Sequence, residues 1–89
     1  ERIYPAQYQV CVRFAPACRW RLVEEYGADS FTVQTDGSLL FRRGFPDANS
    51  VISWILTCGD GAELLKPAEL REQLGALVSR LAQRYEKRR

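Results

Sequence analysis

The order of its periodic segments constrains the fold of this chain more than any other feature. Each segment has either the alternation of a strand or the 3.6-residue period of a helix. In order they are a strand over 8–14, a helix over 16–26, a hairpin over 30–45, a helix over 49–58, a strand over 62–66 and a helix over 67–85. The pattern is therefore βαββαβ followed by one additional helix.

This order predicts an α+β fold of the ferredoxin-like kind. With right-handed crossovers, βαββαβ folds as a split βαβ sandwich with spatial strand order 4-1-3-2 and both crossover helices on one face of the sheet. The other face stays open. It must be solvated, covered by the additional C-terminal helix, or used by a partner.

Local signals set the ends of the helices. Pro16 suits a helix start and Gly27 a C-terminal stop. In the helix between them Trp20, Val23 and Tyr26 share the apolar face, with Leu22 at its edge. For the apolar helix over 49–58, three residues are plausible N-caps. They are Asp47, Asn49 and Ser50.

The hairpin has two alternative registers. A two-residue Asp-Gly loop pairs Val33 with Leu40, whereas a three-residue loop through Ser38 pairs Val33 with Phe41. The second register buries more apolar surface, so we predict it. A slip of one residue would move every side chain of the strand to the other face.

The last two helices differ in how much surface they must bury. The apolar residues of the long helix are Leu70, Leu74, Leu77, Val78, Leu81 and Tyr85. They fall within about 100° of the helical wheel, which predicts one face packed on the core. Those of the preceding helix span roughly 200°, so that helix should touch two surfaces. Either the sheet and the long helix bury it, or Trp54 or Leu56 meets another domain or protomer.

Composition disfavours an enzyme. The chain of 89 residues has no histidine, which removes the usual general base and the commonest metal ligand. The adjacent Glu24 and Glu25 point in different directions on a helix and form no catalytic pair. The cysteines Cys11, Cys18 and Cys58 are odd in number and lack CxxC spacing, so we expect neither a disulfide framework nor a metal site, and no cofactor.

Charge and layout indicate a single cytoplasmic domain that is a piece of a longer protein. The net charge of +2 does not by itself indicate a duplex-binding surface, and we expect the basic KRR end to be solvated. No apolar run approaches the length of a membrane span, and residues 1–7 lack the basic-then-apolar layout of a signal peptide. Because the chain lacks methionine and residues 1–7 lack periodicity, we expect those residues to be a linker from an absent upstream domain. Residues 8–89 then form one domain.

Two arginines are expected on the open face of the sheet. Alternation places Arg13 opposite Val12, and the predicted hairpin register places Arg42 opposite Phe41, on a neighbouring strand. We predict that this pair contacts an anionic partner, because arginine binds carboxylate and phosphate oxygens bidentately. The plain alternative is two solvated arginines on an exposed sheet. Arg43 should instead turn toward the helices.

The sequence resembles the C-terminal WCX region of WYL-domain transcriptional regulators. The similarity runs from about Gln9 to Tyr85 and includes the RFAP strand end and the DGSLLF hairpin. Its most specific part is the pattern W-I-L-x-x-G-x-x-A-E-L-L-x-P-x-E-L-R. The matching residues are Trp54, Ile55, Leu56, Gly59, Ala62, Glu63, Leu64, Leu65, Pro67, Glu69, Leu70 and Arg71. Most of these are apolar, Gly and Pro positions that a fold alone would require.

The resemblance implies a regulator that reads DNA with an N-terminal helix-turn-helix and senses a ligand with a WYL domain, both outside this chain. The WCX region would then help the protein dimerise and convey the signal. We therefore expect an oligomerisation and signal-relay module, not itself the DNA reader. Its expected partners are a second copy, the upstream WYL domain and an anionic ligand, with no membrane contact.

Two other functions fit the predicted fold. The same architecture occurs in ACT-like modules, which bind small-molecule effectors where sheets or helices pair. An RNA-binding module would need outward-facing aromatic residues on the central strands for base stacking. This chain places Leu40, Arg42, Cys11 and Arg13 there instead, so RNA binding is the least favoured function.

Overall fold

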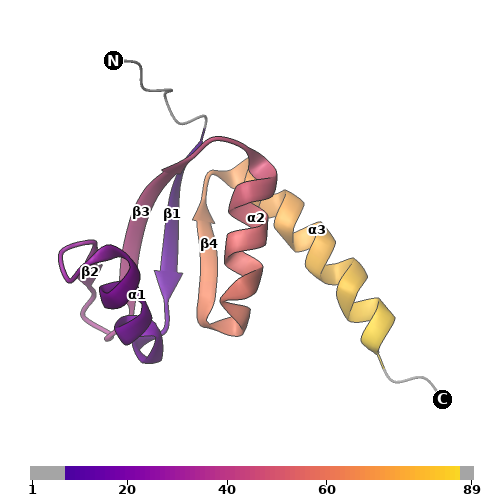
Figure 1. Cartoon of the computed structure of the whole chain (residues 1–89). Coiled ribbons are helices and arrows are strands. Elements are labelled where there is room, and N and C mark those ends of the chain that lie inside the picture. The colour runs from indigo at the N-terminus through magenta and orange to yellow at the C-terminus, as the bar shows by residue number, and fades with distance from the viewer. Residues whose placement is uncertain (1–7, 87–89) are drawn as a thin grey trace.

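The computed structural model describes residues 8–86, so the predicted linker over residues 1–7 lies outside the described part. Within it, every predicted segment is present and in the predicted order (Figure 1). The elements are β1 (Tyr8–Phe14), the 3-10 turn η1 (Pro16–Cys18), α1 (Arg19–Tyr26), β2 (Phe31–Val33), β3 (Leu39–Phe45), α2 (Ala48–Thr57), the 3-10 turn η2 (Gly59–Gly61), β4 (Ala62–Lys66) and α3 (Ala68–Tyr85).

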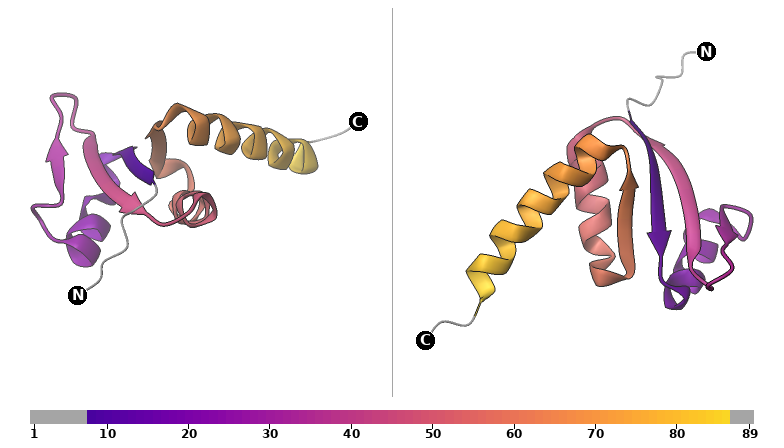
Figure 2. Two further views of the ribbon diagram at one scale, coloured as in Figure 1. Left: turned by 90° about the horizontal axis from the view of Figure 1, so that it is seen from above. Right: turned by 180° about the vertical axis from the view of Figure 1, so that it is seen from behind.

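The four strands form one antiparallel sheet in the order β2-β3-β1-β4. This is the predicted order 4-1-3-2 counted from the other edge. Helices α1 and α2 lie on one side of the sheet, whereas α3 runs off beyond the β4 edge on the other side (Figure 2). The architecture is the predicted α+β, ferredoxin-like arrangement with an additional C-terminal helix.

The core fills the layer between the sheet and the two crossover helices. All three inward positions of β1 from Val10 onward are almost fully buried, as are residues from β3, β4 and all three helices. The core cluster is Val10, Val12, Phe14, Leu22, Leu39, Phe41, Phe45, Val51, Ile55, Leu64, Leu70 and Leu74. Its alternation in β1 and β3 confirms the strand pattern of the sequence.

The β2–β3 hairpin adopts neither of the two registers considered from the sequence. Val33 pairs with Leu39, and Phe31 pairs with Phe41. This register differs by two residues from the predicted pairing of Val33 with Phe41. Because side chains alternate with period two, the slip leaves every side chain on its predicted face. Leu40 and Arg42 therefore still lie on the open face.

The turn chemistry explains the hairpin register. The carboxylate Oδ1 of Asp36 accepts hydrogen bonds from the backbone N–H of Ser38 at 2.9 Å and from its Oγ at 2.6 Å. Gly37 has a φ of 90°, and the N–H of Gln34 donates to the carbonyl of Ser38 at 2.7 Å. The loop therefore comprises residues 35–37, and Ser38 pairs with Gln34 at the end of the hairpin instead of belonging to the loop.

The structure corrects the predicted buried face of α1 and shows which of the three candidate N-caps begins α2. In α1 the predicted core residue Trp20 is 66% exposed, whereas Leu22 is buried, because the helix presents the face through Leu22 to the sheet. In α2 the N-cap is Asp47, whose Oδ1 accepts a hydrogen bond from the N–H of Ser50 at 2.8 Å.

Helix α3 does not bury its whole apolar stripe, contrary to the prediction. Leu70 and Leu74 are buried, but Val78, Leu81 and Tyr85 are 46%, 36% and 83% exposed. The reason is length. An 18-residue helix extends about 27 Å, whereas the five-residue β4 beside it extends about 17 Å. The second half of α3 therefore projects past the domain, as Figures 1 and 2 show.

Among residues 8–86, no helix is both long enough and apolar enough to cross a membrane.

Candidate functional site

The open face of the sheet carries a row of side chains across three strands. Cys11 of β1 lies opposite Arg42 of β3 on one side and Lys66 of β4 on the other. In the next row Arg13 lies between Leu40 and Glu63. The predicted placement of Arg13 and Arg42 on one face of neighbouring strands is therefore confirmed.

The charges on this face are not the simple arginine pair that the sequence predicted. Arg13 Nη1 lies 3.8 Å from Glu63 Oε1, and Glu63 Oε2 lies 3.0 Å from Arg71 Nη1 on α3. All three side chains are about half exposed, so each ion pair contributes only about 0–1 kcal/mol. The pairs nevertheless neutralise part of the face. Periodicity could not predict this pairing, because it depends on the long-range β1–β4 register, which shifts between Cys11 and Val12.

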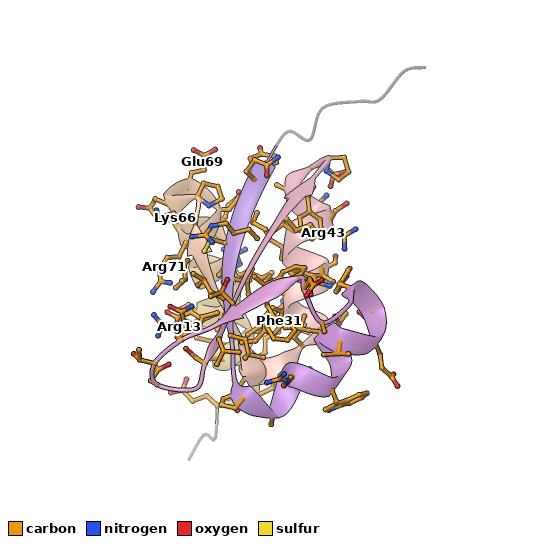
Figure 3. All side chains as sticks on the ribbon, turned by 90° about the vertical axis from the view of Figure 1, so that its left-hand side faces the viewer. Arg13, Phe31, Arg43, Lys66, Glu69 and Arg71 are labelled. Carbon is orange, nitrogen blue, oxygen red and sulfur yellow. The ribbon has the colours of Figure 1, made fainter. Side chains whose placement is uncertain are left out.

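Arg71 also fixes the position of α3 against the sheet. Its Nη1 donates to the backbone carbonyl of Leu64 at 2.8 Å, which satisfies an acceptor of the edge strand β4. Together with the Glu63 contact, this bond ties the first half of α3 to β4. Figure 3 shows Arg13, Lys66 and Arg71 along one side of the sheet and Arg43 on the other.

Arg43 turns toward the helices, as predicted. Its guanidinium carbon lies 4.8 Å from the ring centroid of Tyr26 in α1 and 5.1 Å from that of Phe45. These are cation–π distances. The arginine thus covers the edge of an aromatic cluster, which consists of Phe14, Tyr26, Phe41, Phe45 and Trp54. Arg43 is thus committed to packing within the domain.

Trp54, a predicted interface residue, is a half-buried member of that aromatic cluster. Its ring centroid lies 5.2 Å from that of Phe45, 5.5 Å from that of Phe41 and 5.7 Å from that of Phe14. Leu56, the other predicted interface residue, is 39% exposed. The sheet and α1, which contributes Tyr26, therefore cover Trp54 on the wide apolar arc of α2, and of the two residues Leu56 offers the more accessible side chain.

Two titratable groups within residues 8–86 have pKa values displaced from their usual ranges. Burial raises the pKa of the Cys58 thiol, which lowers its thiolate content at neutral pH. Hydrogen bonds from the side chain and backbone of Ser38 lower the pKa of Asp36. Within the described range 8–86, no three His, Cys, Asp or Glu side chains gather in a way that could hold a metal ion.

A groove between the edge strand β4 and α3 was not predicted from the sequence. Its volume is about 270 Å³. The lining residues are Ala62, Glu63, Leu64, Arg71, Leu74, Gly75 and Val78. Two hollows around Arg13 are smaller, at about 190 and 200 Å³. All three lie below the roughly 300–1,000 Å³ of typical small-molecule sites, which favours a contact surface over an enclosed ligand pocket.

The one sequence signal for this groove is Gly75. A glycine inside a helix costs about 0.8–1 kcal/mol relative to alanine, so it calls for a local reason. In the structure Gly75 is exposed, and a Cβ added there would meet nothing within 4 Å. Nothing within the described domain therefore lies close enough to Gly75 to exclude a side chain at this position.

Comparison with known proteins identifies a family and a fold. The family model of the WCX domain matches residues 6–82. Among solved structures, the chain is similar to the proteasome accessory factor B/C (PafBC) of Arthrobacter aurescens, with a TM-score of 0.74 and 22% sequence identity. The similarity covers 98% of this chain but only 15% of PafBC. No curated protein matches. At this identity the structural similarity establishes the fold.

Proposed function

The chain belongs to the WCX domain family, and on this premise we propose that it is the oligomerisation and signal-relay module of a WYL-type transcriptional regulator. It is a regulatory domain, and it spans about 15% of the length of PafBC, the structure that it resembles. A WYL domain and a DNA-reading helix-turn-helix would lie elsewhere in the same protein.

The exposed half of α3 is the observation that carries this proposal. Val78, Leu81 and Tyr85 form an apolar face on a helix that extends beyond its own core. A tyrosine alone buries about 150–250 Å² when it is covered, so leaving this face in water is unfavourable. Exposed apolar faces of this kind mark contact surfaces for other proteins.

The connection of α3 to the sheet supports the relay part of the proposal. Arg71 bonds both the carbonyl of Leu64 and the carboxylate of Glu63, and Glu63 lies opposite Arg13 on the central strand β1. A partner that shifts the projecting half of α3 therefore acts on β4 and β1 through direct contacts. The signal reaches the open face, where Arg13 and Arg42 lie.

The charge of the domain supports the view that it does not itself read DNA. Residues 8–86 carry nine basic and ten acidic side chains, so the domain lacks the basic surface of a duplex-binding module. We expect any affinity of the chain for duplex DNA to be weak and to fall steeply with salt. Sequence-specific binding that persists at about 200 mM salt would contradict this view.

The assembly role is tested in the full-length regulator with the double variant Leu81→Glu, Tyr85→Glu. Two charges on the exposed face of α3 should alter the oligomeric state and weaken the effector response, while the far-ultraviolet circular dichroism of the domain stays unchanged. The matched control is Gln83→Glu, an exposed position on the opposite side of α3. An unchanged oligomer and an unchanged response in the double variant would refute the proposal.

The open face is the second contact surface in this proposal. Within residues 8–86, neither Arg42 nor Lys66 forms an ion pair, and both flank the small side chain of Cys11. An acidic surface of the WYL domain or of the second protomer, or an anion held by the WYL domain, fits this arrangement. Arg13→Ala and Arg42→Ala should reduce the effector response, and a loss confined to Arg43→Ala would contradict the assignment.

A further inference from the structure

We propose that the projecting half of α3 packs antiparallel on α3 of a second copy of this chain, with Tyr85 of each copy entering the β4–α3 groove of the other. This inference rests on the assembly function proposed above and names its partner and its contact surface. It joins two features that the domain leaves unexplained. One is an exposed tyrosine at the end of a helix, and the other is an open groove at the start of the same helix.

The spacing of α3 residues defines the contact seam. The seam positions are Arg71, Leu74, Val78, Leu81 and Tyr85. They are three and four residues apart in alternation, which is the spacing of helices that pack along their length, and they span about 80° of the helical wheel. Leu70 and Leu74 at the start of α3 are covered by the domain itself, whereas the seam grows more exposed toward its end.

The groove at the start of the seam suits an aromatic side chain. Leu64 and Leu74 supply apolar walls, and Arg71 stands at its edge, where a guanidinium can lie over an aromatic ring. The volume of about 270 Å³ exceeds what one methyl or methylene group would fill. Tyr85 is 83% exposed in its own domain and can bring an apolar ring with a hydroxyl that stays near water or Glu63.

In an antiparallel register, the large side chain of Tyr85 lies against the groove of the second copy, and small side chains lie near each other. When Val78 lies opposite Leu81 of the second copy, Leu74 lies opposite Tyr85 of that copy. Gly75 and Ala82 of the second copy then flank the same edge of the seam, offset by about 3 Å along the helix axes, so small side chains meet there and the two backbones can approach. The proposed contact explains why a glycine stands inside this helix. The domain itself does not explain it, because a Cβ added at Gly75 meets nothing within 4 Å.

The helix dipoles favour the antiparallel direction, because the partly positive start of one α3 then lies near the partly negative end of the other. Parallel helices would place like ends of the two dipoles side by side. The pairing is isologous, so it closes as a dimer and does not propagate into a filament.

The area predicts the strength of the dimer. Val78, Leu81 and Tyr85 of each copy bury on the order of 400 Å² per copy, or about 800 Å² in total, below the usual size of a stable complex. The isolated chain should therefore form a weak, reversible dimer. In the regulator, contacts of the other domains add to it.

The test is sedimentation equilibrium of the 89-residue chain, its Gly75→Leu variant and the matched control Ala76→Leu, from about 10 μM to about 1 mM. The Cβ of a leucine at position 75 meets no atom of its own domain within 4 Å, and leucine favours the helix, yet the side chain hinders the approach of the second copy. Ala76 is exposed and lies away from the seam. We expect self-association of the wild type and the control, and a dissociation constant raised by about tenfold or more in Gly75→Leu.

A second variant, Tyr85→Ala, should weaken the dimer as well, because it empties the groove. If the wild type dimerises and Gly75→Leu leaves the dimer intact, the docking geometry is wrong while the assembly function stands. If the wild type remains at the monomer mass of 10.2 kDa at all concentrations, the α3 dimer is refuted, whereas the assembly function is refuted only by the double variant in the full-length regulator.

Discussion

Replacing Trp54 with alanine should destabilise the domain strongly, because this side chain joins α2 to the sheet and to α1. Its ring lies within 6.2 Å of the ring centroids of four aromatic residues. Removing it leaves a cavity beneath α2 that backbone relaxation cannot close, since β1 and β3 hold the other rings in place. The exposed position of Trp20 provides a matched tryptophan for comparison.

The magnitude follows from the contacts. A fully buried tryptophan costs about 3–5 kcal/mol on truncation to alanine, and Trp54 is half-buried, so we expect about 3 kcal/mol. A domain of this size has a total stability of roughly 4–13 kcal/mol. At about 4–8 °C per kcal/mol, the Trp54→Ala variant should melt roughly 12–24 °C below the wild type.

Urea denaturation followed by circular dichroism at 222 nm measures the effect for Trp54→Ala and Trp20→Ala side by side. Trp20→Ala should change the unfolding free energy by no more than about 0.5 kcal/mol, because its side chain is mostly exposed. A loss of less than about 1 kcal/mol in Trp54→Ala, together with a changed oligomeric state, would refute this reasoning and assign Trp54 to an interface.

Two further predictions concern local hydrogen bonds. Asp47→Ala should lower the unfolding free energy by about 1 kcal/mol in urea denaturation through loss of the α2 cap, whereas Asn49→Ala should have little effect. The pKa of Asp36, lowered by hydrogen bonds from Ser38, should contribute stability that is present above about pH 3.9 and is lost as the pH falls through the folded pKa. An NMR titration should show the pKa of Asp36 returning toward its ordinary value in Ser38→Ala, and no change would contradict the assignment.

The segments of this fold were predictable because each carries its own period and end signals. Alternation in β1 and the cap at Asp47 are local properties, so neither requires knowledge of the rest of the chain. The strand order followed from the handedness of the crossovers. The hairpin register was not predictable in this way, because it depends on hydrogen bonds between Asp36 and Ser38 that compete with other loop lengths.

The candidate contact surfaces were only partly predictable. Periodicity shows which face of α3 is apolar, but it does not show where the domain ends beneath that face, so the exposure of Leu81 and Tyr85 was missed. The network of Arg13 with Glu63 depends on the β1–β4 pairing, which is long-range in sequence. The same limit applies to the two tryptophans, whose burial depends on how each helix is rotated against the sheet.

Interchain disulfide formation between a Gly75→Cys chain and an Ala82→Cys chain examines the proposed pairing of α3 at residue level. In the antiparallel register these positions flank the same edge of the seam, offset by about 3 Å along the helix axes, and the close approach proposed there brings their Cα atoms toward the roughly 7 Å limit for a disulfide. Two copies of position 75 lie about 13 Å apart along the helices, too far to bond. Crosslinks through the native thiols of Cys11, Cys18 and Cys58 form the background, which is measured on the wild type.

We predict that the mixture of the two variants yields a crosslinked heterodimer under mild oxidation, and that neither variant alone exceeds the wild-type background. Crosslinking of Gly75→Cys with itself would indicate parallel helices. A dimer that forms in the mixture without any heterodisulfide would place the contact elsewhere on the molecule. Either result would contradict the proposed antiparallel assembly through α3.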